Sequence, residues 1–186
     1  MKRSEPYGRE RGRVFPGESR VRGRGPGLAA LGAACLLAIA APVPAAAQDD
    51  ADRAAVLAVL DRLFDGMRAH DGDMVRSVFA DGAVMIGTEA GDGAPRTTVR
   101  PAEGFAQAVA DGEGVWDEPY WDPIIHIQDH LATVWTKYAF YLGEEFSHCG
   151  IDAVILGRGP DGWKIAAVAD SRERENCELP PDRPGG

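Results

Sequence analysis

A long stripe of apolar positions begins shortly after residue 50. From Asp52 onward apolar side chains recur every three or four residues, which is the spacing of one face of a helix. The stripe consists of Val56, Leu57, Leu60, Leu63, Phe64 and Met67. Asp49, Asp50 and Asp52 can cap this helix and favour its positive end, and Asp71-Gly72 can end it. The pattern predicts an amphipathic helix with one buried face.

Two shorter helices are predicted around a hairpin. Asp73 caps the first, and Asp81-Gly82 turns the chain out of it. Residues 83–87 and 96–100 have strand composition and flank a loop rich in Gly, Asp and Pro. Pro101 suits the first turn of the next helix. The apolar faces of the two helices carry Met74, Val75, Val78 and Phe79 in the first, and Ala102, Phe105 and Val109 in the second.

Long β segments fill the rest of the chain. The pattern predicts four antiparallel strands, joined by short polar connectors, over residues 120–128, 131–142, 146–156 and 163–172. Helices followed by such strands predict an α+β fold, in which a curved antiparallel sheet wraps around the N-terminal helix. The proline-rich tail, residues 178–186, is expected to be disordered.

The first 47 residues differ in kind from the remainder. An arginine-rich stretch is followed by a 14-residue apolar run from Leu28 to Ala41 and by small residues at Ala45 and Ala47. This order is typical of a cleavable signal peptide, and the run is too short for a membrane-spanning helix. The sequence therefore predicts export to the periplasm or the extracellular space, with a signal peptide over 1–47 and one domain over 48–177.

Removing that leader changes the charge balance. It contains eight of the 20 basic residues and three of the 29 acidic ones, so 12 basic and 26 acidic residues remain, a net charge of −14. A domain this acidic repels phosphate backbones and anionic lipids. Nucleic-acid binding and stable membrane insertion are therefore not expected, and a small molecule is the expected partner.

His148 is the strongest candidate for chemistry. It begins one predicted strand, and the hairpin brings it toward Asp170 and Arg172 at the end of the next. A histidine, a carboxylate and a guanidinium together could carry a proton or bind an anionic group, with His148 and Asp170 as the catalytic pair. Whether the three share a face depends on the hairpin register, which the sequence leaves open. The alternatives are a structural hydrogen bond for His148 and a salt bridge for the other two.

Further ligand-binding candidates lie on the same strands. Tyr138, Trp135, His126 and Arg172 could contact a flat ligand, although aromatic residues on strands are more often core. No histidine or cysteine spacing indicates a metal site, and nothing indicates a cofactor. Cys149 and Cys177 are the cysteines left after processing. In an oxidising compartment we expect a disulfide between them, the alternative being two free thiols.

Several short segments carry a family resemblance: Tyr138-Ala139-Phe140-Tyr141, Phe146-Ser147-His148-Cys149-Gly150, Asp161-Gly162-Trp163-Lys164-Ile165 and Asp170-Ser171-Arg172. Over residues 52–177 the chain resembles exported bacterial members of the nuclear transport factor 2-like and SnoaL-like superfamily, of the type labelled putative lumazine-binding. The resemblance implies a cone-shaped fold with a cavity between sheet and helices. It lends fold more than function.

The enzymes of this superfamily guide the functional hypotheses. Ketosteroid isomerase uses a cavity tyrosine that the first helix here lacks, and only Asp170 could imitate the single aspartate of SnoaL-like cyclases. We therefore weigh three functions: binding of a small apolar or heteroaromatic molecule by a homodimer joined through the outer sheet face, acid–base catalysis of the lyase or isomerase type by a His/Asp pair, and protein interaction. A shielded acid or histidine with a shifted pKa favours the enzyme, an apolar cavity without one favours binding, and a filled cavity favours interaction.

Overall fold

The computed structural model describes residues 45–90 and 94–181, so the predicted signal peptide lies outside the described residues up to position 44. The helices are α1 (Ala45–Arg68), α2 (Gly72–Val78) and α3 (Ala102–Asp111). The strands are β1 (Phe79–Ala90), β2 (Pro95–Pro101), β3 (Trp116–Asp117), β4 (Tyr120–Gln128), β5 (Leu131–Leu142), β6 (Glu145–Gly159) and β7 (Gly162–Arg172). The predicted α+β class is confirmed.

All strands belong to one curved sheet. Its order is β2-β1-β7-β6-β5-β3, and β4 pairs with β5 beside β3. Neighbouring strands are antiparallel except for β1 and β7, which run parallel. The expectation of a wholly antiparallel sheet is therefore wrong at this one pairing. Parallel strands need a long connection, and here nearly the whole domain lies between the two.

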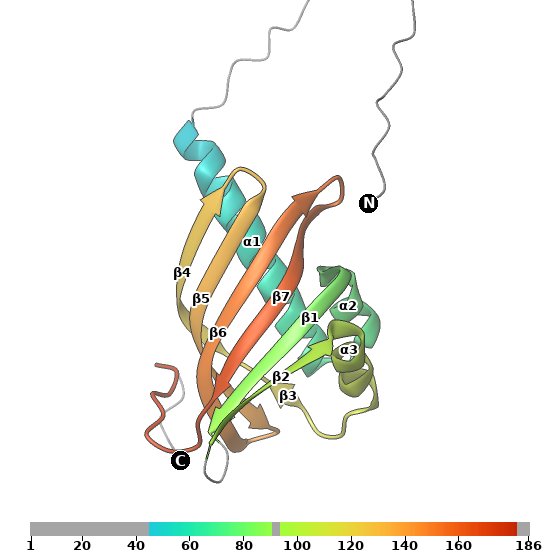
Figure 1. The fold of residues 1–186 in the computed structure, drawn as a ribbon, viewed down its shortest axis with the longest axis vertical. Helices are drawn as coiled ribbons and strands as arrows, with labels where there is room; N and C mark the ends of the chain where they lie inside the picture. Colours follow the sequence, from blue (N-terminus) through green and yellow to red (C-terminus); the bar gives the residue numbers. More distant parts are fainter. Residues whose placement is uncertain (1–44, 91–93, 182–186) are drawn as a thin grey trace, which may run out of the picture. The chain divides into compact units, whose positions relative to one another are not determined.

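The core lies between α1 and the concave side of the sheet. In Figure 1, α1 runs behind the strands, and α2 and α3 lie beside β1 and β2. The predicted stripe is the buried face of α1, with Val56 and Leu60 fully buried. Val134, Leu156 and Ile165 from the sheet complete the same cluster. Burial of this stripe holds α1 in place, because apolar area removed from water is the main stabilising contribution.

Helix ends differ from the prediction. α1 begins at Ala45, so Asp49 and Asp50 lie within it and cap nothing. Asp52 instead pairs with Arg158 of β6, whose guanidinium lies 4.5 Å from the Trp163 ring centre. Asp71 is the N-cap of α2, because its carboxylate accepts from the Met74 amide at 2.8 Å. Asp73, predicted as that cap, lies in the first turn of the helix.

β1 is longer than expected. It begins at Phe79 rather than at residue 83, and the predicted turn at Asp81-Gly82 lies within it. The register shifts between Phe79 and Val84, and Gly82 has a φ of +77°. A positive φ is easy for glycine, so the turn signal marks an irregularity in a strand instead of an end.

The C-terminal segment remains against the domain as far as it is described. Glu178 accepts from the Lys137 ammonium at 2.7 Å, and Pro180 is buried. Residues 182–186, which belong to the tail expected to be disordered, lie outside the described residues. Within residues 45–90 and 94–181, no helix is long and apolar enough to cross a membrane.

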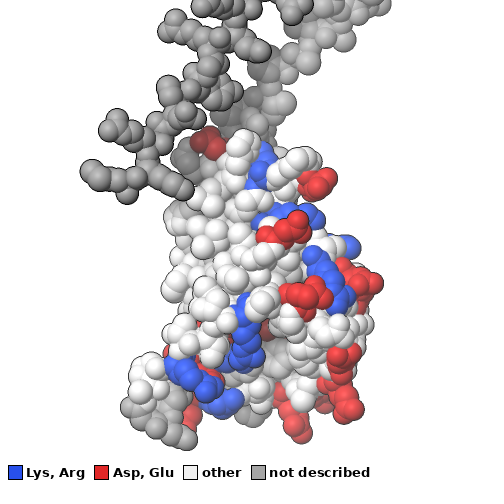
Figure 2. All heavy atoms as spheres, turned by 45° about the vertical axis from the view of Figure 1, so that its right-hand side comes forward, with Lys and Arg blue, Asp and Glu red and all other residues white. Residues whose placement is uncertain are grey.

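The surface in Figure 2 carries acidic and basic side chains interspersed over one part and a wide uncharged area over another. Large apolar side chains are exposed on the outer face of the sheet. Ile124 of β4, Trp135 of β5 and Ile155 of β6 are 56, 54 and 44 % exposed. Ile124 and Trp135 are direct cross-strand partners, so they form a patch on the side of the sheet away from α1.

Candidate functional site

A cavity of about 740 Å³ opens between α1, α3 and the sheet. Its walls are mostly apolar, and aromatic rings come from three different elements: Phe105 of α3, Trp116 of β3 and Phe140 of β5. Trp116 and Phe140 meet edge to face with ring centres 5.9 Å apart. Volume and lining are those of a site for a drug-sized organic molecule.

Polar groups gather at the inner end of this cavity. A smaller pocket there shares Met67, Met85, Phe105, Glu118 and Arg172 with the main cavity, so the two are contiguous. The inner pocket adds four polar side chains from the sheet: Tyr138, His148, Asp152 and Asp170. The arrangement is an apolar chamber with ionisable groups concentrated at its closed end.

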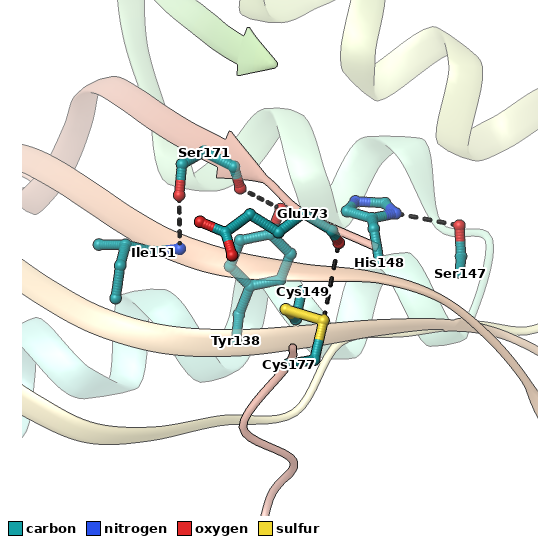
Figure 3. The surroundings of a disulfide bond; sticks show 8 residues. All are labelled: Tyr138, Ser147, His148, Cys149, Ile151, Ser171, Glu173 and Cys177. Carbon is teal, nitrogen blue, oxygen red and sulfur yellow. Dashed lines mark hydrogen bonds between the residues drawn. A yellow bond between two sulfur atoms is a disulfide. The ribbon is translucent and has the colours of Figure 1, made fainter. Parts of the chain in front are cut away.

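The end of β7 is shaped by Gly150. The Ser171 carbonyl points at the Gly150 backbone so closely that a Cβ there would lie 1.9 Å from the oxygen. This carbonyl accepts from the Tyr138 hydroxyl at 2.8 Å, and the Ser171 hydroxyl accepts from the Ile151 amide at 3.0 Å (Figure 3). The space beside Gly150 is therefore filled by the protein itself and leaves no room for a ligand.

A disulfide joins Cys149 and Cys177, consistent with the expected pairing, and their Cα atoms are 5.9 Å apart. Next to it, Cys149 and Glu173 exchange backbone hydrogen bonds of 2.9 Å. Figure 3 shows the disulfide beside Glu173, whose carbonyl oxygen lies 3.7 Å from Cys177 Sγ. Cys149 and its neighbour His148 leave opposite faces of β6, as adjacent strand residues do. The disulfide thus attaches the segment after β7 to one face of β6, and His148 lies on the opposite face of the same strand.

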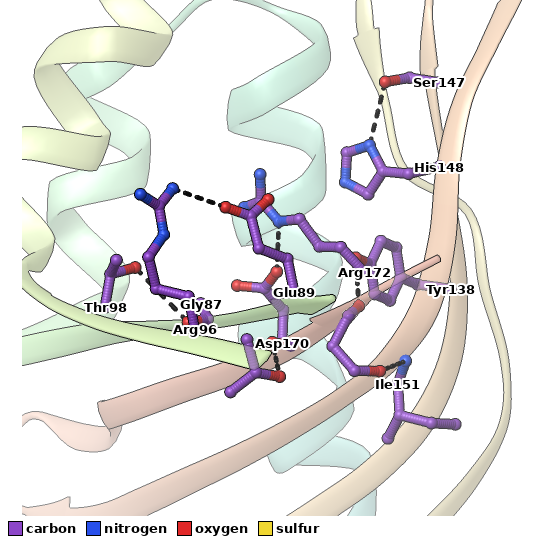
Figure 4. Close-up of polar contacts among 12 residues, drawn as sticks. Gly87, Glu89, Arg96, Thr98, Tyr138, Ser147, His148, Ile151, Asp170 and Arg172 are labelled. Atoms are coloured by element: carbon purple, nitrogen blue, oxygen red, sulfur yellow. Dashed lines mark hydrogen bonds and ion pairs between the residues drawn. The ribbon is translucent and has the colours of Figure 1, made fainter. Parts of the chain in front are cut away.

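The register places the predicted residues on one face. Asp152 and Asp170 are direct partners across β6 and β7, and His148, Asp170 and Arg172 all line the inner pocket. Arg172 Nε lies 2.6 Å from Asp170 Oδ2, so the salt bridge considered from the sequence is present (Figure 4). Asp170 is buried and Arg172 is about half exposed. The pair therefore spans from the floor of the pocket toward solvent.

His148 is buried among aromatic rings. Its ring centre lies 5.7 Å from that of Tyr138 and 5.1 Å from that of Phe140, and Nδ1 is 3.0 Å from the Ser147 hydroxyl. Burial, with the nearby Arg172 guanidinium, lowers the pKa of His148 to about 4. The imidazole is therefore neutral at pH 7 and can exchange a hydrogen bond, but it does not act as a cation toward Asp170.

Two acids that the sequence reasoning missed complete the site. Burial and the neighbouring Asp170 raise the pKa of Asp152 to about 7, and a hydrogen bond joins it to Glu118. Burial and the two aspartates raise the pKa of Glu118 well above its usual range. The pair therefore holds a proton between two carboxyl groups near neutral pH. Such a group can donate or accept a proton.

The sequence contained a signal for one of these acids. Asp152 stands two residues before Val154 in an alternating strand, so its side chain shares the buried face of that strand. A lone carboxylate at a core position is the kind of residue whose pKa shifts at functional sites. Glu118 has no such signal, because it lies in the short link between β3 and β4.

Two predicted ligand contacts lie elsewhere. Trp135 is 54 % exposed and pairs with Ile124, and His126 is exposed on β4 opposite Thr133. Both face outward, because Val134 and Ile125 beside them point into the core. Neither side chain is among those that line the cavity or its inner pocket, so the cavity gives their predicted ligand contact no support. Tyr138, by contrast, is buried at the inner pocket, where burial raises the pKa of its hydroxyl.

The described residues contain no group of three or more His, Cys, Asp or Glu side chains arranged to hold a metal ion. The cavity and its inner pocket combine mostly apolar walls with hydrogen-bonding and proton-exchanging groups at one end.

Comparisons with solved structures agree with this fold. A protein of unknown function from Mycobacterium tuberculosis has a TM-score of 0.59 at 13 % identity, covering 72 % of this chain and 78 % of its own. An NTF2-like protein with a cystatin-like fold from Novosphingobium aromaticivorans has a TM-score of 0.58 at 10 % identity, covering 71 % of this chain and 88 % of its own. An NTF2-like protein of unknown function from Shewanella baltica has a TM-score of 0.55 at 15 % identity, covering 72 % of this chain and 100 % of its own. At these identities the likeness shows the fold alone.

The sequence comparisons are more specific. No curated protein matches this chain. The model of the family described as putative lumazine-binding matches residues 51–169, which include most of α1, the strands β1 to β6 and Asp152, and end just before Asp170. The chain therefore belongs to the putative lumazine-binding family and has a nuclear transport factor 2-like fold.

Proposed function

We propose that this protein is an exported domain that binds a small apolar or heteroaromatic molecule in its cavity. The observation that carries the proposal is the chamber of about 740 Å³, walled by Phe105, Trp116 and Phe140 and closed by polar groups at one end. Apolar walls supply affinity through burial, while a few polar groups orient the ligand. Membership of a family described as putative lumazine-binding supports a heteroaromatic ligand.

The test uses an uncharged aromatic probe. N-phenyl-1-naphthylamine fluoresces strongly when it leaves water for an apolar site, so we expect its emission to rise with the chain from Gln48 onward. Ala108 lines the cavity on α3, and Ala108→Phe should weaken this binding by filling the chamber. Gln107→Phe, at the adjacent exposed position, is the matched control. No probe binding, or equal loss in both variants, would contradict the proposal.

A second candidate function is acid–base catalysis, which the Glu118–Asp152 pair favours. An acid with a pKa near 7 in a shielded pocket is suited to move a proton to and from a bound molecule. His148 and Asp170, the pair expected from the sequence, then act beside it, with Asp170 held by Arg172. A shielded acid with a shifted pKa favours an enzyme of the lyase or isomerase type over a plain binding domain.

Mass spectrometry separates the two candidates. Gently purified protein should carry its natural ligand, whose mass is read in native spectra. If the protein is an enzyme, incubation of that ligand with the wild type changes its mass or its chromatographic mobility, and Asp152→Asn abolishes the change while keeping affinity for the uncharged probe. An unchanged ligand in both proteins supports binding alone. The third candidate function, protein interaction alone, does not require an open cavity, so the cavity disfavours it.

Export and self-association belong to the same proposal. The signal-peptide pattern and the Cys149–Cys177 bridge both suit an oxidising compartment outside the cytoplasm. A second copy would cover the exposed patch of Ile124, Trp135 and Ile155. Sedimentation should then give a dimer that Trp135→Ser dissociates and that Val115→Ser, an exposed apolar control away from the patch, leaves intact. A monomeric wild type would rule out this assembly.

A further inference from the structure

We propose that the cavity takes an organic anion, whose charged group is anchored by Arg100 at the edge of the site. The proposal rests on the proposed function, because it specifies the class of molecule that the same cavity binds. Arg100 belongs neither to the acid pair Glu118–Asp152 nor to the set His148, Asp170 and Arg172.

Arg100 stands where two hollows meet. It lines the main cavity and also an adjoining pocket of about 140 Å³, formed by the inward side of β1, β2 and the end of β7. In the β1–β2 ladder its partner is Met85, which lines both hollows as well. Arg172 is the other cation that lines both. The ends of these two side chains thus border the passage from the apolar chamber to the smaller pocket.

The charges of the smaller pocket are paired except at Arg100. Glu89 is bound by Arg96 at 2.8 Å, and Asp170 is bound by Arg172 at 2.6 Å. Figure 4 shows these two ion pairs, Glu89 with Arg96 and Asp170 with Arg172. Arg100 makes no ion pair or side-chain hydrogen bond with any residue of the described ranges 45–90 and 94–181. It is therefore the cation whose donors are available to a ligand.

The small pocket exists because β1 has a glycine at its centre. Gly87 lies opposite Thr98 on β2 and Asp170 on β7, and a Cβ on it would come within 3.2 Å of the Thr98 hydroxyl. Without that atom, room remains beside Arg100 for a compact group such as a carboxylate. The Thr98 hydroxyl is 3.4 Å from the Gly87 carbonyl, a weak contact that can be exchanged for a ligand oxygen.

The rest of the cavity sets how the ligand lies. Aromatic walls favour a ring system, and the acid Glu113 on the cavity lining disfavours an anion away from Arg100. A guanidinium binds a planar oxyanion with two parallel hydrogen bonds. The ligand class that fits is an aromatic or polycyclic organic acid, with its ring in the chamber and its anionic group at Arg100.

Two dyes of the same shape test this. The sulfonated dye 1-anilinonaphthalene-8-sulfonate differs from N-phenyl-1-naphthylamine by one anionic group, so the ratio of their affinities isolates the contribution of that group. Arg100→Gln should weaken the sulfonate about tenfold, the loss of one charge-assisted contact, and leave the uncharged dye unchanged. Arg100→Lys should recover part of the loss. Arg96→Gln, on the same strand but already paired with Glu89, is the control.

The outcomes are distinct. An unchanged sulfonate affinity in Arg100→Gln, or an equal loss in Arg96→Gln, overturns the anchoring role while uncharged-dye binding preserves the proposed function. Equal losses of both dyes in Arg100→Gln also overturn it, because the residue would then shape the cavity and not recognise charge. Failure of the uncharged dye to bind wild-type protein removes the proposed function and this inference together.

Discussion

Asp152 and Asp170 are direct partners across the β6–β7 ladder, and both are buried. Two carboxylates in this position repel each other, and burial makes each charge more costly. The two carboxyl groups differ in their partners and in their protonation. Asp170 is paired with Arg172, whereas Asp152 shares a hydrogen bond with Glu118 and keeps its proton up to about pH 7. One facing pair thus yields a fixed ion pair and an exchangeable proton.

Asp152→Asn should change how stability depends on pH. The pKa of Asp152 is about 7 in the folded protein and 3.8 ordinarily, so between these values the folded state holds a proton that the unfolded chain has released. Its contribution to stability therefore falls as pH rises from about 4 to 7. Relative to wild type, the variant should gain several degrees in Tm over that range in thermal melts. The Tm of Asp161→Asn, a change in an exposed turn, should depend on pH in the same way as that of wild type. The same pH dependence in Asp152→Asn would contradict the raised pKa of Asp152.

His148→Phe should show the opposite slope. The pKa of His148 is about 4 in the folded protein against 6.5 ordinarily, so the unfolded chain takes up the proton first as pH falls. The histidine therefore destabilises the fold progressively between about pH 6.5 and 4. The variant should melt increasingly above wild type toward pH 4. His126→Phe, on the exposed outer position of β4, provides the control, and equal slopes in the two variants would count against a buried neutral imidazole.

Gly150→Ala should be strongly destabilising. A Cβ would lie 1.9 Å from the Ser171 carbonyl oxygen, so β6 and β7 must separate and the hydrogen bond from Tyr138 is disturbed. We expect a loss on the order of 2 kcal/mol or more in urea denaturation. Gly157→Ala on the same strand meets nothing within 4 Å and should cost little. Similar losses in both variants would show that the close approach at Gly150 does not exist in solution.

Removing the disulfide should also destabilise the domain. Cys149 and Cys177 are 28 residues apart, and closing such a loop contributes roughly 3.5 kcal/mol in the chain-entropy model. We expect the Cys149→Ser, Cys177→Ser double variant to lose about that much in denaturant titrations, and wild type to lose the same under reducing conditions. Thiol titration of denatured, unreduced protein starting at Gln48 should find no free thiol. Two free thiols would refute the bridge.

Local patterns were enough to predict most elements. β4 (Tyr120–Gln128) and β5 (Leu131–Leu142) have the predicted bounds, because their residues alternate and Asp129-His130 is an evident turn, with Asp129 at a φ of 53°. For Phe79 the sequence predicts a helix instead, because four apolar residues at helical spacing precede the irregularity at Gly82, whereas the structure places Phe79 in β1. The end of α2 and the start of β1 are both apolar, so composition does not show where the helix stops. Pairing with β7 places Phe79 in the strand.

The geometry of the site depended on one residue that no pattern marks. Near the turn Leu156 pairs with Ile165, but farther along Ile155 pairs with Ala167, so Ala166 is left without a partner. Without this bulge Asp170 would face Ile151 and point outward with it. Histidine, aspartate and arginine could therefore be named from the sequence, but not placed on one face.

The parallel pairing of β1 and β7 affects how the chain reaches its fold. The Thr88 hydroxyl donates to the Asp170 carbonyl, 82 residues later, so the hairpin of β1 and β2 has no neighbour in the sheet until the final strand has arrived. A chain that emerges from its N-terminus exposes the β1 edge throughout that interval, and such edges invite pairing with other chains. We therefore expect the growing chain to be most prone to aggregation before β7 is made, and truncations upstream of Gly162 should accumulate as insoluble material.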